Sequence, residues 1–275
     1  MTAAGIFLTH DRRPRVRRHF ERLVRESGHL VTWHFVYSRD TGARPRAPFA
    51  YPDPAQLLPR RYRLMMVNGG VRGGYLDVLF VPVMTALPAD HVWLMEYDVD
   101  YAGSWDELFS EFRDNDADLL TTALMYKSQH PQWLHWKTVE TPPWVREDQL
   151  VRALNPLMRI SRQLLSTYAV AMADQRWSGT YEYLLSTIAV VSGGQVEDLG
   201  NEGSFTPPER HARIYTGRSS SGRPDNMTFR YRPPRPRYYH EAPEDFEKPH
   251  MLYHPVKAGV PTWKKGDASE MPPPS

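Results

Sequence analysis

The segment from His91 to Asp100 constrains the fold of this chain most, because a strongly apolar run ends there in three carboxylates. The run is typical of a buried β-strand, and Glu96, Asp98 and Asp100 follow at its carboxyl end. Carboxylates this close together repel one another unless a positive charge lies between them. If the strand extends to Asp100, its two-residue period directs all three to one side, where a cation such as Mg²⁺ or Mn²⁺ finds the oxygen ligands it prefers. The segment therefore predicts a metal site at the end of a strand.

An alternative remains open for the same residues, namely a strand end whose acids are solvated or paired with arginines. Short acidic motifs match by chance, and Asp98-Val99-Asp100 taken alone favours this alternative. The flanking sequence favours the metal site, because a buried strand precedes the motif and a capping box, Ser104 with Glu107, starts a helix after it. Open α/β sheets bind their ligands at the carboxyl ends of such strands.

Strand and helix patterns alternate through the first half of the chain. Strands are predicted at 4–10, 30–37, 62–67, 91–100 and 118–123, with a long loop at 41–61 and helices beginning at 14, 75 and 105. This order predicts a mostly parallel sheet with helices on both faces. The second half is less regular, with a strand at 151–160, a short strand at 195–199, and helices at 162–173 and 181–191 capped by Ser161 and Thr180.

Composition limits the classes of protein to which the chain can belong. Its 275 residues suffice to bury a substantial core, and the net charge of +2 does not indicate a general polyanion binder, although arginines cluster at 12–18 and 230–237. The chain has no cysteine, which excludes disulfides, thiolate metal sites and cysteine nucleophiles. No apolar run is long enough to span a bilayer and no secretory signal is evident, so we expect a cytoplasmic protein.

Four segments together carry a resemblance to a known family. They are the N-terminal strand-helix-strand that ends in Asp40, residues 96–100, residues 177–182 (Trp-Ser-Gly-Thr-Tyr-Glu) and residues 253–257 (Tyr-His-Pro-Val-Lys). In order and position they resemble the nucleotide-diphospho-sugar transferases of the GT-A fold, which are glycosyltransferases of the Asp-x-Asp type.

The resemblance implies a single α/β domain over residues 1–265, with a Rossmann-like, mostly parallel sheet flanked by helices. It implies a nucleotide-binding half at 1–125 and an irregular acceptor-side half at 126–265. Residues 266–275 have the composition of a disordered tail.

The resemblance also implies roles on the donor side. A divalent metal, Mn²⁺ or Mg²⁺, would bridge the diphosphate of a nucleotide sugar to Asp98 and Asp100, with His254 as a further ligand and Lys257 neutralising the diphosphate. The chemistry needs such groups, because the diphosphate leaves with additional negative charge. Taken alone, His254 is more simply a loop histidine beside Pro255.

The ends of the first two predicted strands carry candidate nucleotide contacts. Thr9, His10 and Asp40 lie where proteins of the GT-A fold contact base and ribose. Asp40 can accept a hydrogen bond from a base N–H, but an acid after a strand is also ordinary turn chemistry.

Glu182 is the candidate catalytic residue. It resembles the acceptor-side acid of inverting GT-A enzymes, which takes the proton from the attacking hydroxyl as a general base. The alternative is an acid near a helix start that only serves the helix dipole, and a transfer that retains configuration needs no such base.

The acceptor is a saccharide or another hydroxyl-bearing molecule, which the sequence does not identify. Sugars stack on indole faces, so the loop after residue 123 offers a candidate acceptor wall; the alternative is core packing under a long loop. The aromatic residues of this candidate wall are Tyr126, Trp133, Trp136 and Trp144.

Two other classes of function remain as alternatives. A metal-dependent nucleotidyl or phosphoryl transferase could use the same carboxylates, but the sequence has no Walker lysine motif and no glycine-rich nucleotidyl loop. A non-catalytic, arginine-rich nucleic-acid-binding protein would use the basic segments, but no recognised reading motif is present. We therefore expect no nucleic-acid partner.

Overall fold

The computed structural model describes residues 3–11, 13–37, 66–67, 70–71, 74–217, 227–231, 237–238 and 246–257. Asp40, the predicted loop at 41–61 and the predicted tail at 266–275 lie outside these residues, as does the side chain of Lys257.

The fold is an α/β fold built on one mixed sheet of six strands, in the order β2-β1-β5-β8-β7-β9. β1 pairs in parallel with β2 and β5, and β9 pairs in parallel with β7, while β8 runs antiparallel to both of its neighbours. The prediction of a mostly parallel sheet is therefore confirmed. The strands are β1 (Ala3–Thr9), β2 (Val31–Tyr37), β5 (His91–Glu96), β7 (Leu119–Tyr126), β8 (Val151–Ser161) and β9 (Val196–Asp198).

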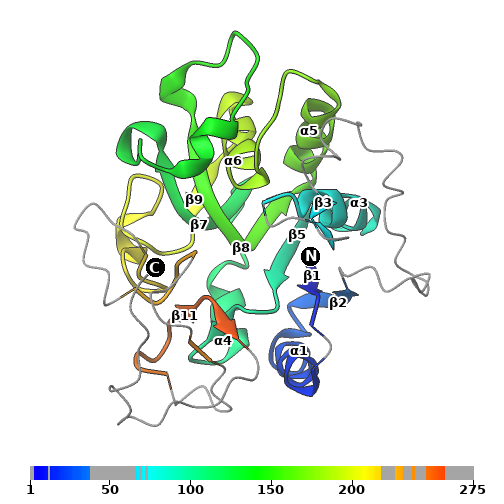
Figure 1. The fold of residues 1–275 in the computed structure, drawn as a ribbon. Helices are drawn as coiled ribbons and strands as arrows, with labels where there is room; N and C mark the ends of the chain where they lie inside the picture. The colour runs from blue at the N-terminus through cyan, green and yellow to red at the C-terminus, as the bar shows by residue number, and fades with distance from the viewer. Residues whose placement is uncertain are drawn as a thin grey trace, which may run out of the picture.

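Helices cover both faces of the sheet, as expected. They are α1 (Pro14–Ser27), α3 (Asp77–Ala86), α4 (Trp105–Glu111), α5 (Arg162–Ala173) and α6 (Tyr181–Val191). Figure 1 shows α1 and α4 in the lower part of the view and α5 and α6 in the upper part. Side chains alternate along each strand, so Phe7 and Trp93 pack in the cluster of α1 and α4, while Ile6 and Leu94 pack in the cluster of α3, α5 and α6.

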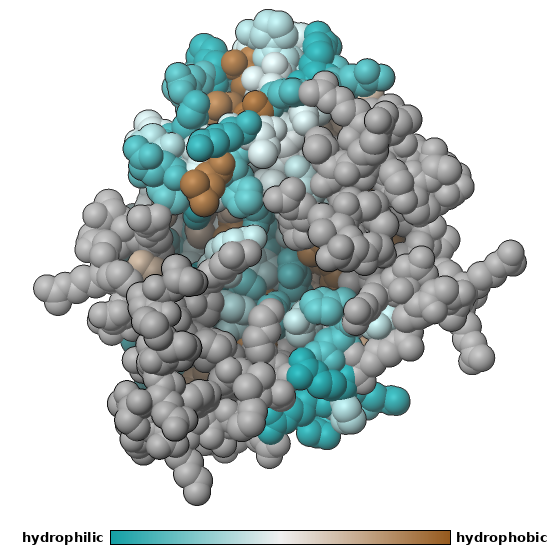
Figure 2. Space-filling view, in the orientation of Figure 1, coloured by the Kyte–Doolittle hydropathy of each residue, from teal (hydrophilic) through white to brown (hydrophobic). Residues whose placement is uncertain are grey.

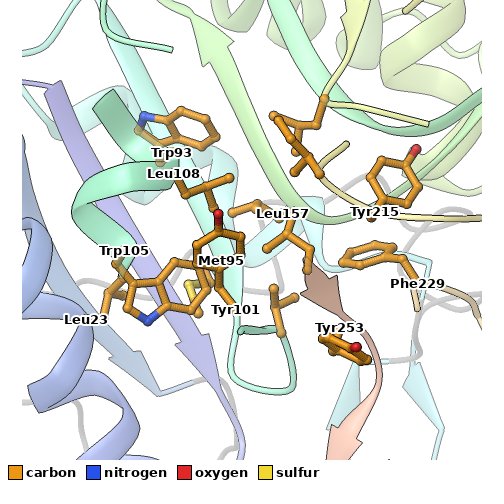
Figure 3. Close-up of a cluster of buried hydrophobic side chains, with 14 of the residues drawn as sticks. Leu23, Trp93, Met95, Tyr101, Trp105, Leu108, Leu157, Tyr215, Phe229 and Tyr253 are labelled. Carbon is orange, nitrogen blue, oxygen red and sulfur yellow. The ribbon is translucent and has the colours of Figure 1, made fainter. Parts of the chain in front are cut away.

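The C-terminal segment, by which we mean the described residues 227–231 and 246–257, packs in the same core as α1 and α4. Figure 3 shows one continuous cluster that runs from Leu23 and Trp105 to Phe229 and Tyr253. Trp105 is fully buried, and truncating such a side chain typically costs about 3–5 kcal/mol. The C-terminal segment is therefore part of the domain and can supply residues to a site.

Three short ladders complete the described strands. β6 (Asp100–Tyr101) pairs antiparallel with β11 (Leu252–Tyr253), so the chain after β5 lies beside the C-terminal segment (Figure 1). The other ladders join β3 (Met66–Val67) to β4 (Gly70–Val71) and β10 (Arg237–Tyr238) to β12 (Val256–Lys257). Among the described residues, short 3₁₀ helices lie in the connections, namely η2 (Lys127–Gln129), η3 (Leu134–Thr138), η4 (Glu147–Gln149) and η5 (Pro208–Arg210).

The predicted caps of α4 and α5 are present, whereas the predicted roles of Glu107 and Thr180 in capping are not observed. The hydroxyls of Ser104 and Ser161 accept from the amides of Asp106 and Leu164, as predicted. Glu107, expected to close a capping box, instead pairs with the imidazole of His250.

The remaining difference is at α6. This helix begins directly after Thr180, as predicted, but the Thr180 side chain makes no capping hydrogen bond. Among the described residues, no helix has the length and apolar character needed to cross a membrane.

Candidate functional site

β5 is shorter than the sequence predicted, and this changes the arrangement of the three carboxylates. The strand ends at Glu96, and a turn follows in which the amide of Val99 donates to the carbonyl of Glu96 over 3.1 Å. The expectation that Glu96, Asp98 and Asp100 project from one continuous strand is therefore wrong. The turn separates the acids, and each of them faces a different partner.

Asp98 faces His254, which comes from the C-terminal segment. The Nε2 atom of His254 lies 3.6 Å from Oδ1 of Asp98, and both side chains are buried. The backbone fixes this approach, because the amide of Val256 donates to the carbonyl of Asp98 over 2.8 Å. Two predicted metal ligands that are distant in sequence thus lie side by side.

The tautomer of His254 follows from its second nitrogen. Nδ1 lies 2.8 Å from the carbonyl oxygen of Arg230, and a carbonyl oxygen only accepts, so Nδ1 carries a proton. In the neutral ring Nε2 is then the unprotonated nitrogen, and it is the atom that faces Asp98. Metal-binding histidines are commonly held in this way, with the other N–H donated to a backbone carbonyl.

Asp100 is held by α1. Its Oδ1 accepts from Arg22 over 2.9 Å and from the amide of Tyr101 over 2.8 Å, and Nδ1 of His19 lies 3.9 Å away. Arg22 also donates to the carbonyls of Tyr101 and Gly103. Asp100 therefore fixes the turn against α1, and its place among the metal ligands stays a prediction.

His19 stabilises the same turn from the buried face of α1. Its Nε2 lies 2.8 Å from the carbonyl oxygen of Val99. Burial lowers the pKa of His19, although the nearby charge of Asp100 opposes this effect. The imidazole thus acts here as a buried hydrogen-bonding group.

The first turn of α6 carries Glu182, which is buried. Burial raises the pKa of Glu182 to about 7, against the opposing effect of the positive charge of Arg152. No side chain in the described part of the chain donates a hydrogen bond to its carboxylate. Glu182 is thus a buried acid whose ionised form is poorly stabilised.

Neighbouring segments converge on the start of α6. The hydroxyl of Tyr181 donates to Oε1 of Glu96 over 3.2 Å, which joins the helix to the end of β5. The amide of Tyr181 donates to the carbonyl of Gly74 over 2.8 Å. Gly74 has a φ of 88°, and a Cβ there would lie 2.9 Å from the Thr180 side chain, so only glycine fits without strain.

The loop between β7 and β8 also docks on this helix start. Glu140 and Ser178 exchange two backbone hydrogen bonds of 2.9 and 3.1 Å, and the Trp136 ring packs edge-on against Tyr183 at 5.8 Å. The Trp133 ring lies 5.5 Å from the Arg152 guanidinium carbon. The loop therefore lies beside Glu182.

The predicted aromatic wall is only partly assembled. Trp133 and Trp136 contact each other at 4.9 Å, but Tyr126 packs against Phe205 and Trp144 packs against Arg176. His135, which the sequence interleaves with these aromatic residues, adjoins Trp133, and Tyr231, which the sequence did not indicate, adjoins His135. The His135 ring lies 5.0 Å from Trp133 and 6.2 Å from Tyr231 of the C-terminal segment.

Arg152 was also missed by the sequence analysis, because its position depends on an irregularity in β7. The pairing register of β7 with β8 shifts around Ala123, which has a φ of 55°, and Arg152 donates to the Ala123 carbonyl over 3.2 Å. The hydroxyl of Tyr215 accepts from the Ala123 amide and donates to Asp198. A buried polar cluster thus holds the bulge that positions Arg152.

The candidate nucleotide contacts at the end of β1 lie next to the end of β5. The amide of Tyr97 donates to the carbonyl of Leu8 over 2.9 Å, and its ring packs edge-on against His10 at 4.9 Å. The Thr9 hydroxyl accepts from the Asp11 amide and donates to the Asp11 carbonyl. Tyr97 precedes Asp98 in the chain, so its contacts bring Thr9 and His10 near the candidate metal ligands.

Comparisons with known proteins do not identify the chain. No family model matches it, and no curated protein matches it significantly.

Proposed function

We propose that this chain is a glycosyltransferase that moves a sugar from a nucleotide-diphosphate sugar to a hydroxyl-bearing acceptor. In this proposal Asp98 and His254 hold a divalent cation, Mn²⁺ or Mg²⁺, and Glu182 is the general base. The mixed α/β sheet supports the proposal, since the candidate residues gather at the carboxyl ends of β1 and β5, where such sheets bind ligands.

One observation carries the proposal, namely the contact between the Asp98 carboxylate and Nε2 of His254 at 3.6 Å. In the neutral tautomer both atoms are acceptors, and two acceptors so close repel unless a cation or a proton lies between them. A doubly protonated His254 is the alternative. Metal titration distinguishes the two.

Asp98 and His254 supply only two ligands, which suits a cation whose remaining ligands come from the substrate and from water. Among the described residues, no group of three or more histidine, cysteine, aspartate or glutamate side chains could hold a metal alone. Mg²⁺ in nucleotide-dependent enzymes is typically held by one or two carboxylates together with substrate phosphates and water. When bound, the cation would stabilise the charge that develops on the departing diphosphate.

The acceptor side supports an inverting transfer. A general base works best when its pKa is close to the operating pH, and burial brings the pKa of Glu182 to about 7. Glu182 would take the proton of the acceptor hydroxyl as that oxygen attacks the anomeric carbon. The base and the proposed cation would then act on opposite sides of the transferred sugar.

Calorimetric titration of the full chain tests the proposal. UDP, GDP and their sugars are titrated with and without Mn²⁺, and we expect one nucleotide to bind in a Mn²⁺-dependent manner. His254→Gln should weaken this binding at least about tenfold, whereas His250→Gln, which changes an exposed histidine, should not. Absence of any Mn²⁺-dependent nucleotide binding, or equal binding by both variants, contradicts the proposal. Release of pyrophosphate from a nucleoside triphosphate would instead indicate a nucleotidyl transferase.

A further inference from the structure

Three aromatic rings connect the two ends of the proposed site, and we refer to Trp133, His135 and Tyr231 as the aromatic bridge. Trp133 and His135 belong to the loop between β7 and β8, and Tyr231 belongs to the C-terminal segment. The ring centroids are 5.0 Å apart between Trp133 and His135 and 6.2 Å apart between His135 and Tyr231. The bridge therefore joins two segments that are distant in sequence.

Each end of the bridge is linked through one arginine to a residue of the proposed site, His254 at one end and Glu182 at the other. Tyr231 follows Arg230, whose carbonyl accepts from Nδ1 of His254 and whose amide donates to the His254 carbonyl over 3.0 Å. At the other end, Trp133 packs against Arg152, whose positive charge acts on Glu182. The bridge thus extends from the proposed cation ligands to the proposed base.

The bridge is accessible to a ligand. Tyr231 is 51% exposed, and Trp133 and His135 are partly exposed. Figure 2 shows isolated apolar side chains among hydrophilic ones in the upper part of the view, where Figure 1 places the loop between β7 and β8. Trp105 in the core, by contrast, is fully covered.

We infer that the acceptor is a saccharide and that its pyranose ring packs against the aromatic bridge beside Glu182. This inference rests on the proposed transferase and narrows its acceptor to one chemical class. The C–H groups of a pyranose face carry partial positive charge and pack favourably on the negative face of an aromatic ring. The hydroxyls at the edge of the sugar need hydrogen-bond partners, and imidazole, phenol and guanidinium groups carry polar atoms.

The chemistry of the bridge favours a saccharide over other hydroxyl-bearing acceptors. A lipid alcohol needs a long, uninterrupted apolar surface, but the bridge carries the polar atoms of His135 and Tyr231 next to the Trp133 ring. A serine or threonine peptide would be held mainly by hydrogen bonds to its backbone, and aromatic ring faces do not supply such hydrogen bonds. Ring faces with polar atoms beside them match the C–H faces and hydroxyls of a sugar.

Saturation-transfer NMR on the full chain with Mn²⁺ and UDP or GDP tests this inference. The probes are maltose, cellobiose, lactose and mannobiose, with a serine- and threonine-containing pentapeptide and octanol as comparators. We expect at least one disaccharide to bind and the comparators not to bind. Tyr231→Ala should weaken disaccharide binding about tenfold, because it removes one stacking face, and Tyr231→Phe should largely retain it.

Two controls make the result specific. Trp144→Leu removes an exposed indole that packs against Arg176 instead of the bridge, and it should bind disaccharides as the wild type does. Thermal unfolding of each variant checks that the fold is intact, which we expect because the Tyr231 side chain is largely exposed.

The outcomes separate this inference from the proposal on which it rests. Mn²⁺-dependent nucleotide binding without any disaccharide binding overturns the saccharide acceptor and leaves the transferase. Disaccharide binding that is equal in the wild type and Tyr231→Ala, or peptide or octanol binding that depends on Tyr231, also overturns it. Disaccharide binding that depends on Tyr231, without Mn²⁺-dependent nucleotide binding, supports the sugar site and contradicts the transferase.

Discussion

The turn after β5 and the first turn of α6 both carry buried acids, but the side-chain partners of those acids differ. In the turn, Asp100 accepts from Arg22 and Asp98 faces His254, so each of these two carboxylates lies beside a side chain from another element. In α6, Glu182 is buried without a donor among the described side chains, and the pKa of Glu182 rises to about 7. The first region therefore pairs its carboxylates with side chains from other elements, whereas the Glu182 carboxylate receives no side-chain hydrogen bond in the described part of the chain.

The largest effect that this comparison predicts is on the rate of transfer. A positioned general base typically contributes about 10²–10⁴-fold, so Glu182→Gln should reduce the turnover of the nucleotide sugar by that factor. Donor binding should change little, because the proposed base would contact the acceptor hydroxyl and not the nucleotide. Steady-state kinetics together with donor titration check both parts, and Glu209→Gln serves as an exposed control. Unchanged turnover in Glu182→Gln would leave the residue with a structural role only.

The next largest effect is on stability in the turn region. Arg22→Met leaves the Asp100 carboxylate buried without its cation, which typically costs about 3–5 kcal/mol of unfolding free energy. Arg17→Met is the matched control on the same helix, because Arg17 is exposed and pairs with Glu21 one turn away. That change should cost at most about 0.5 kcal/mol. Urea denaturation measures both, and equal losses would contradict a stabilising role of the pair of Arg22 and Asp100.

The free energy of unfolding should also depend on pH through Glu182. The pKa of Glu182 in the folded chain is above its ordinary value of 4.5, so between pH 4.5 and 7 the unfolded chain has lost a proton that the folded chain keeps. The free energy of unfolding therefore falls as pH rises through this range, by up to about 3 kcal/mol. Above pH 7 the fall is complete.

Denaturation at pH 5 and pH 8 measures this dependence. In Glu182→Gln the contribution should disappear, so the variant should gain stability over the wild type at pH 8 but not at pH 5. A loss of stability at both pH values would show that the carboxylate serves the helix dipole.

The smallest predicted effect concerns the helix that follows the turn. The Ser104 hydroxyl accepts from the amide of Asp106, so Ser104→Ala should cost about 1 kcal/mol. The Thr180 hydroxyl makes no such bond at the start of α6, so Thr180→Ala should cost clearly less. Equal losses in thermal unfolding would mean that the two helix starts are capped alike.

The sequence predicted the parts of the fold that local patterns determine. Apolar runs, which are typical of strands buried on both faces, located the six strands of the sheet. Helical spacing and capping residues located the starts of α1, α4, α5 and α6. The end of β5 was predicted four residues too late, since Glu96 is the last residue of the strand and Asp100 was expected. Tertiary contacts set that end, such as the bond between Tyr97 and Leu8, and local sequence does not encode them.

The candidate site was predictable only where a resemblance linked distant residues. Asp98 and His254 were both named, and the structure brings them together. Arg152 was missed because its position depends on a left-handed backbone at Ala123, a residue that gives no local signal for that conformation. Tyr231 was missed because its contact with His135 joins two irregular segments.

The most direct test of the proposed cation site is Mn²⁺ binding in the presence of the nucleotide. It is measured by electron paramagnetic resonance for the wild type, Asp98→Asn and Asp100→Asn. Asp98→Asn removes a charged ligand at constant size, and we expect the apparent affinity for Mn²⁺ to fall at least about tenfold. The same fall in Asp100→Asn would confirm Asp100 as a further ligand, whereas unchanged affinity with lower stability would show that it only holds the turn. Wild-type Mn²⁺ affinity in Asp98→Asn would contradict a cation shared between Asp98 and His254.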